Sequence, residues 1–170
     1  MKFATIRACL GWAFQMSQTV NLKTAKYGEQ SAPAFGGESQ GDQIMTAINI
    51  MNKVSRLPED EQAVIVAYFT GDQKAVIKAA CCLPMGWPTP MRRMFARSWA
   101  RGEQLEMSQA EIAATYNFAQ KTASRRWNEA CSELNKRLNN AMAVLELQML
   151  DLVSVPGRAN MHRLHHCIAA

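Results

Sequence analysis

The sequence has no uncharged apolar run long enough to cross a bilayer. Its most apolar stretch, residues 1–21, is interrupted by Arg7 and Gln15. The same stretch is a poor signal peptide, because its charged start is thin and no small-residue cleavage site follows. We expect a short amphipathic helix that docks on the core or on a partner. Strands are not expected either, since β-branched residues are few and never alternate with polar ones over a useful length.

Residues typical of catalytic and metal centres are also scarce. The five cysteines are odd in number and form no CxxC motif, which is typical of reduced thiols rather than of disulfides, zinc or a redox centre. The histidines, His162, His165 and His166, lie beside Cys167 in the C-terminal tail, where a closed metal site would lack ligands from elsewhere. No Gly-rich phosphate loop is present. We expect a non-enzymatic protein with no metal and no cofactor.

Positive charge is present but unevenly distributed. The net charge is +5, and residues 91–138 hold nine Lys and Arg against five Asp and Glu. Residues 58–90 hold two against four. A basic excess of this kind is required of a phosphate-binding surface, although a solvated helical face is charged as well.

Glycine, serine and proline divide the chain into segments. Residues 28–41 (GEQSAPAFGGESQG) predict a flexible linker. The linker separates an N-terminal helical arm, residues 1–27, from a helical domain, residues 42–153, which a tail of residues 154–170 follows. The predicted fold is all-α: a compact helical domain built around a helix-turn-helix, with an N-terminal arm and a long C-terminal helix.

The first helices of that domain follow from apolar spacing and from proline. A helix beginning at Asp42 would bury the stripe formed by Ile44, Ile48, Met51 and Val54. A second helix would begin at Pro58, with acidic residues in its first turn, and end at Gly71.

Residues 73–107 form the next segment of the domain. A helix from about Gln73 to Cys82 is followed by a rigid turn, Leu83–Pro90, which contains three prolines and a glycine. Helix resumes over residues 91–101. Four arginines on its polar side are candidates for phosphate or partner contact: Arg92, Arg93, Arg97 and Arg101.

Residues 108–127 carry the most informative pattern. Ser108 and Glu111 have the spacing of a capping box, which satisfies free amides at a helix start. Tyr116-Asn117-Phe118 would form a tight turn, where Asn tolerates a left-handed backbone better than most residues. A second helix would then bury Ala123 and Trp127. This is the layout of a helix-turn-helix whose second helix enters the DNA major groove, although a helix pair with a merely solvated outer face would look similar.

On the DNA-binding interpretation, the second helix turns basic and amide groups outward. Lys121 and Arg125 would donate to guanine edges, and Gln120 would bond to adenine. Arg126 would hold a phosphate. The candidate DNA-binding residues are Gln120, Lys121, Thr122, Ser124, Arg125, Arg126 and Asn128.

The helical pattern continues for about thirty residues beyond Ala119. Apolar residues recur every three or four positions, close to a heptad seam. Part of the seam would cover the core, and the rest would be free to pair with a second copy of the chain, so a homodimer stays open. The seam consists of Leu134, Leu138, Met142, Leu145, Met149 and Leu152.

Two segments together resemble a known family. LPEDEQAVIVAYFTGD (Leu57–Asp72), paired with SQAEIAATYNFAQKTASRRWNEACSEL (Ser108–Leu134), is similar to region 4, the promoter-reading domain of bacterial sigma factors. In that family an acidic helix that begins with Leu-Pro precedes a helix-turn-helix. The two parts lie closer together there, so residues 73–107 are an insertion. The resemblance implies that bases are read by Gln120, Lys121, Thr122, Ser124 and Arg125.

A small basic chain with such a motif and an N-terminal arm also resembles the late-gene antitermination Q proteins of bacteriophages. That resemblance implies binding to a double-stranded DNA element near a promoter, followed by loading onto bacterial RNA polymerase in the cytoplasm of the host. The sigma factor is a further candidate partner, and no membrane is involved. The arm and the face bearing Arg92, Arg93 and Arg97 would contact polymerase. Two alternatives stay open: a polymerase-binding adaptor or inhibitor without specific DNA binding, and a dimeric helix-turn-helix repressor.

Overall fold

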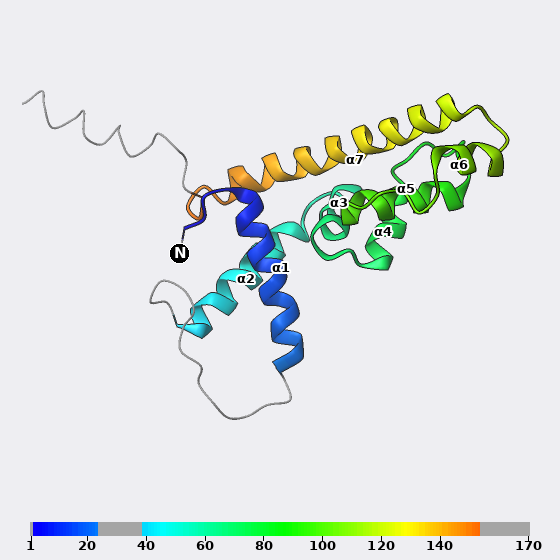
Figure 1. Ribbon diagram of the computed structural model, residues 1–170. Helices are drawn as coiled ribbons and strands as arrows, with labels where there is room; N and C mark the ends of the chain where they lie inside the picture. The colour runs from blue at the N-terminus through cyan, green and yellow to red at the C-terminus, as the bar shows by residue number, and fades with distance from the viewer. Residues whose placement is uncertain (1, 24–38, 154–170) are drawn as a thin grey trace, which may run out of the picture. The chain divides into compact units, whose positions relative to one another are not determined.

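The computed structural model describes residues 2–23 and 39–153, and these residues confirm an all-α protein (Figure 1). Within them no strand forms beyond one isolated bridge, and none of the helices is long and apolar enough to span a membrane. The helices of the described residues are α1 (Ile6–Lys23), α2 (Gln40–Val54), α3 (Glu59–Thr70), α4 (Gln73–Ala80), α5 (Thr89–Arg101), α6 (Gln109–Thr115) and α7 (Gln120–Gln148).

The chain divides into two compact units. The second unit is Asn52–Ala143, and the first draws on the residues before and after it. This division differs from the predicted domain of residues 42–153, because the start of α2 and the end of α7 group with α1. Most of the predicted linker and the whole histidine-bearing tail, residues 154–170, lie outside the described residues.

The first unit contains the amphipathic helix expected near the N-terminus. One side of α1 is buried through Cys9, Leu10 and Ala13, none of which is exposed at all. The amide of Phe3 donates to the carbonyl of Leu152 at 2.7 Å. The first residues of the chain and the residues after α7 therefore lie side by side in this unit.

The predicted apolar stripe of α2 is only partly correct: Val54 is buried as predicted and Ile44 and Met51 are half-buried, but Ile48 is not covered. Ala47, Ile50 and Val54 are at most 3% exposed, whereas Ile48 is 45% exposed. The prediction left out Ala47 and Ile50, so the buried face of α2 is centred slightly to one side of the predicted stripe and still includes Val54.

The second unit is built on α3, α4 and α5, which pack against one another. Helix α3 follows Pro58, carries three acidic residues in its first turn and ends at Gly71, whose φ is 63°. Asp72 then caps α4, because its carboxylate accepts a hydrogen bond of 2.9 Å from the amide of Ala75. The predicted break at Gly71-Asp72 is confirmed.

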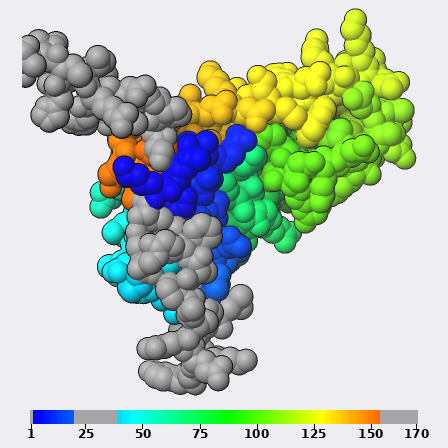
Figure 2. Space-filling model, turned by 60° about the vertical axis from the view of Figure 1, so that its left-hand side comes forward, coloured from blue at the N-terminus to red at the C-terminus, as the bar shows by residue number. Residues whose placement is uncertain are grey.

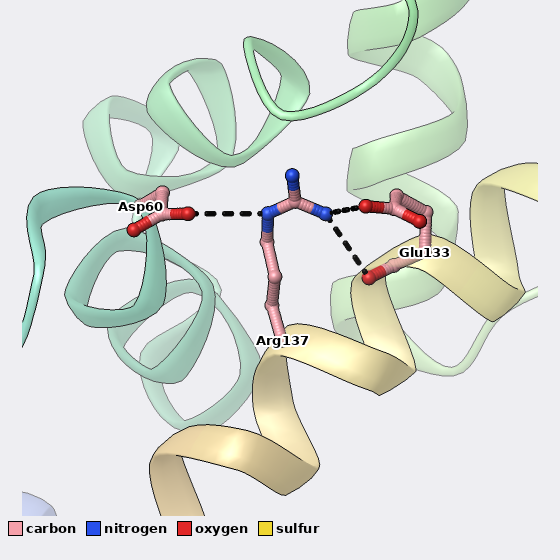
Figure 3. A network of polar contacts seen from close by, with 3 residues as sticks. All are labelled: Asp60, Glu133 and Arg137. Carbon is pink, nitrogen blue, oxygen red and sulfur yellow. Dashed lines mark hydrogen bonds and ion pairs between the residues drawn. The ribbon is translucent and has the colours of Figure 1, made fainter.

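Within this unit α7 is fixed to α5 and α3 by polar contacts. The Nε1 of Trp99 donates to Oδ1 of Asn135 at 3.0 Å. Further along α7, Arg137 Nε lies 3.3 Å from Oδ2 of Asp60, and the same guanidinium also bonds to Glu133 one turn away (Figure 3). Arg137 thus joins α7 to the acidic first turn of α3.

The predicted leucine seam of α7 is buried within the chain. Leu134, Leu138, Leu145 and Met149 are at most 2% exposed. Of the predicted seam, Leu152 alone is half-exposed, so most of the seam is covered by the chain itself. The homodimer stays a prediction.

Candidate nucleic-acid interface

The predicted capping box at the start of α6 is present. The hydroxyl of Ser108 accepts from the amide of Glu111 at 3.2 Å, and Oε2 of Glu111 accepts from the amide of Ser108 at 2.7 Å. These hydrogen bonds favour the carboxylate and lower the pKa of Glu111. The beginning of α6 is thereby defined by its own side chains.

A tight turn joins α6 to α7, as the sequence predicts. Asn117 has a φ of 53°, and it is the only non-glycine residue of the described chain in the left-handed region. The amide of Phe118 donates to the carbonyl of Ala113 at 3.0 Å, and that of Asn117 donates to Ala114 at 3.4 Å. This pair of bonds forms a Schellman motif, which fixes the direction in which the chain leaves α6.

The start of α7 is held against α5 by small and aromatic residues. Ala123 is 1% exposed, as predicted. Trp127 is only half-buried, because one side of its ring packs edge-on against Phe95 with 5.4 Å between the ring centroids. Phe95 also contacts Trp87 of the proline-rich turn at 6.2 Å. The residues between Gln73 and Met107 thus support the helix-turn-helix rather than interrupt it.

The outer face of the same helix carries the predicted base-reading side chains. Gln120, Lys121, Arg125 and Asn128 are exposed, and Thr122 and Ser124 are half-exposed. Figure 2 shows the first half of α7 (yellow) at the surface of the molecule. A shallow depression of about 480 Å³ runs along this face, and it is lined by Ala119, Lys121, Thr122, Ser124, Arg125 and Asn128.

The charges on this face lack partners within the described part of the chain. Neither Lys121 nor Arg125 forms an ion pair with a described residue, and the first turn of α7 contains no acidic residue. The two cations stand four residues apart, where like charges destabilise a helix by about 0.2–0.5 kcal/mol. The arrangement does not stabilise the fold. An external anion is therefore the better explanation for the two adjacent cations.

Arg126 has a different environment from its neighbour Arg125. Its guanidinium carbon lies 4.5 Å from the centre of the Phe118 ring and 5.7 Å from that of Trp87. Cations over aromatic faces are attracted by the ring quadrupole. The side chain is half-buried and joins the turn before α7 to the proline-rich turn. The sequence predicted that Arg126 holds a phosphate and did not predict this double stacking. Trp87 in the proline-rich turn was the only feature of the sequence that pointed to the stacking.

Helix α5 presents its four arginines in three different settings. Arg97 pairs with Glu106 at 2.9 Å and Arg101 with Glu103 at 3.7 Å, so the loop before α6 neutralises both. Arg93 is exposed. The placement of Arg92 on an exposed polar face is wrong, because this residue is only 8% exposed. A helical side chain leans toward the N-terminus, and the proline-rich turn covers that end of α5.

A second hollow of the same unit offers a weaker candidate site. It measures about 600 Å³ and is lined by Glu59, Asp60, Ala63, Lys78, Cys81, Cys82 and Arg137. Its charges satisfy one another: Lys78 bonds to Glu59 at 2.8 Å, and Arg137 pairs with Asp60 (Figure 3). Burial raises the pKa of the Cys82 thiol, which disfavours its reactive thiolate.

Comparisons with known proteins add no family assignment. No family model, no curated protein and no solved structure matches the chain. Among the described residues, no group of three or more His, Cys, Asp and Glu side chains is placed to hold a metal ion. The candidate interface therefore depends on its own geometry and charge.

Proposed function

We propose that the chain binds duplex DNA through α6 and α7 and regulates transcription. The start of α7 would enter the major groove, as the second helix of a helix-turn-helix does. Lys121 and Arg125 would donate to guanine edges, while Gln120 and Asn128 suit adenine or backbone oxygens.

The observation that carries this proposal is a pair of exposed cations on α7 that form no ion pair with any described residue. Lys121 and Arg125 line one depression together with neutral polar side chains, and no acidic residue lines it. Beneath the face, Ala123 and the Phe95–Trp127 contact hold α7 in place. A rigid helix with free donors on its outer face meets the needs of base recognition.

Bacterial RNA polymerase is the proposed protein partner, and antitermination is the proposed mode of regulation. Both derive from the resemblance of Leu57–Asp72 and Ser108–Leu134 to sigma region 4 and of the chain to phage Q proteins. The alternative is an adaptor or inhibitor that binds polymerase and has no affinity for DNA.

Fluorescence anisotropy with a random-sequence duplex separates these alternatives. We expect wild-type protein to bind with an affinity that falls steeply between 50 and 200 mM salt, because binding releases counterions from phosphates. Lys121→Gln combined with Arg125→Gln should weaken binding, whereas Lys74→Gln combined with Lys136→Gln is a matched control on exposed residues outside the interface. Polymerase capture without any DNA binding would favour the adaptor instead.

A further inference from the structure

Arg92 is a buried cation without a carboxylate. It is 8% exposed, and among the described residues its Nε has no hydrogen-bond partner and its guanidinium forms no ion pair. A buried charge is normally paired, since removing it from water without compensation is costly. Nothing in the packing of the second unit explains why an arginine stands here rather than an apolar residue.

The acceptors that the Arg92 guanidinium does contact are weak or neutral. One terminal nitrogen lies 3.4 Å from Sδ of Met85 and the other 3.2 Å from Oγ1 of Thr89. A thioether sulfur is a poor acceptor. Met85 is 79% exposed, so its side chain is free to move away and leave a guanidinium donor at the surface.

The same guanidinium lies at the first turn of α5. Thr89 begins this helix of thirteen residues, and the N-cap residue, Pro88, provides no side-chain hydrogen bond. In this turn Pro90 has no N–H and Met91 is fully buried, so the amide of the exposed Thr89, together with the helix dipole, is what favours an anion. Arg93 in the same turn is exposed and also lacks an ion pair with a described residue.

We infer that Arg92 and the first turn of α5 form a phosphate site, with Met85 occupying the position of one phosphate oxygen in the free protein. The phosphate would come from the DNA backbone. Trp87 precedes Pro88 and contacts Arg126 of α7, which joins this site to the proposed reading helix. The choice of DNA as the source rests on the proposed function, whereas the affinity for phosphate does not.

Inorganic phosphate tests the site in the wild-type chain without DNA. The protein is titrated at constant ionic strength while the ¹⁵N resonances are followed. The Arg92 Nε–H and the amide of Thr89 should shift together and saturate. Arg56, an exposed arginine outside both proposed interfaces, is the matched control. Equal, non-saturating shifts at Arg92 and Arg56 would overturn the phosphate site, and no variant needs to fold for this result.

Duplex DNA tests the source of the phosphate. Arg92→Met keeps the buried stem and removes the charge, so it should bind the same sequence with the salt slope reduced by about 0.9. The affinity lost between 50 and 200 mM salt should then be roughly 3.5-fold smaller than in the wild type. Arg56→Met should keep the wild-type slope. Circular dichroism establishes that each variant is folded.

Neutral methylphosphonates placed one at a time in the duplex locate the contact. One position should weaken the wild type and leave Arg92→Met unchanged. If the protein binds DNA specifically and every methylphosphonate affects both proteins equally, the inference is wrong while the proposed function stands. If inorganic phosphate binds at Arg92 and DNA does not bind at all, the site is real and both its assignment to DNA and the proposed function fail.

Discussion

The Arg126 guanidinium carbon lies 4.5 Å from the centre of the Phe118 ring, and this contact joins α7 to the turn that precedes it. Trp87 lies on the same guanidinium at 5.7 Å. This double stacking makes Arg126 a structural residue beside the exposed Arg125. We therefore expect substitution of Arg126 to lower the stability of the fold and substitution of Arg125 to change DNA binding.

Arg126→Ala should lower the free energy of unfolding by about 1 kcal/mol, because cation–π contacts of partly buried arginines are worth about that much. Urea denaturation followed by circular dichroism measures the change. Lys136→Ala, at an exposed position of the same helix, should stay within about 0.5 kcal/mol of wild type. The prediction fails if Arg126→Ala has wild-type stability and its DNA binding has a smaller salt slope. That result would mean that Arg126 contacts a phosphate.

The turn makes a second prediction at Asn117, whose φ of 53° is strained for any residue with a Cβ. Asn117→Ala should destabilise the protein by about 1 kcal/mol, since alanine enters the left-handed region less readily than asparagine. Asn117→Gly should be neutral or slightly stabilising, because glycine has no Cβ to clash. Asn140→Ala, at an exposed position within α7, is the control for the loss of an asparagine side chain outside the turn. Equal effects of alanine and glycine at position 117 would contradict the left-handed turn.

The capping box predicts a dependence of stability on pH. The pKa of Glu111 is lowered from its ordinary value of 4.5 in the folded protein by its hydrogen bonds with Ser108. The contribution of this carboxylate is therefore fully present above that ordinary value, and it is lost as the pH falls through the lower folded pKa. It is not lost on the alkaline side.

Melting temperatures measured from pH 7 to pH 3 test this dependence. Glu111→Gln keeps a side-chain acceptor for the cap but does not titrate, so its melting temperature should fall less steeply with acid than that of the wild type. Glu129→Gln, at an exposed position with no capping role, should follow the wild-type curve. Parallel curves for all three proteins would show that the ionisation of Glu111 contributes nothing to stability.

The sequence was most informative where a local rule determines the structure. The Ser108–Glu111 cap, the left-handed Asn117 and the break at Gly71-Asp72 depend on a few neighbouring residues, and all three were predicted. The exposure of Lys121 and Arg125 followed from helical periodicity alone.

Features that depend on distant residues were not predictable in the same way. Ala47 is buried although its size gives no strong signal, so the buried face of α2 was predicted only in part. Arg92 is buried because a turn several residues earlier covers it, and a charged residue on a helix is normally assigned to the solvent. The stacking of Arg126 on Trp87 joins residues 39 positions apart, which spacing along one helix does not reveal.

The central claim is that the exposed face at the start of α7 reads bases. Its most direct test is repeated selection of bound duplexes from a random pool, performed in parallel with wild type and with Arg125→Ala. Loss of one base contact costs about 1–3 kcal/mol and relaxes specificity at one position. We therefore expect the wild type to enrich a common sequence and the variant to lose its preference at one base pair or more. Enrichment of the same sequence with equal affinity by both proteins would contradict the assignment of α7 as the reading helix.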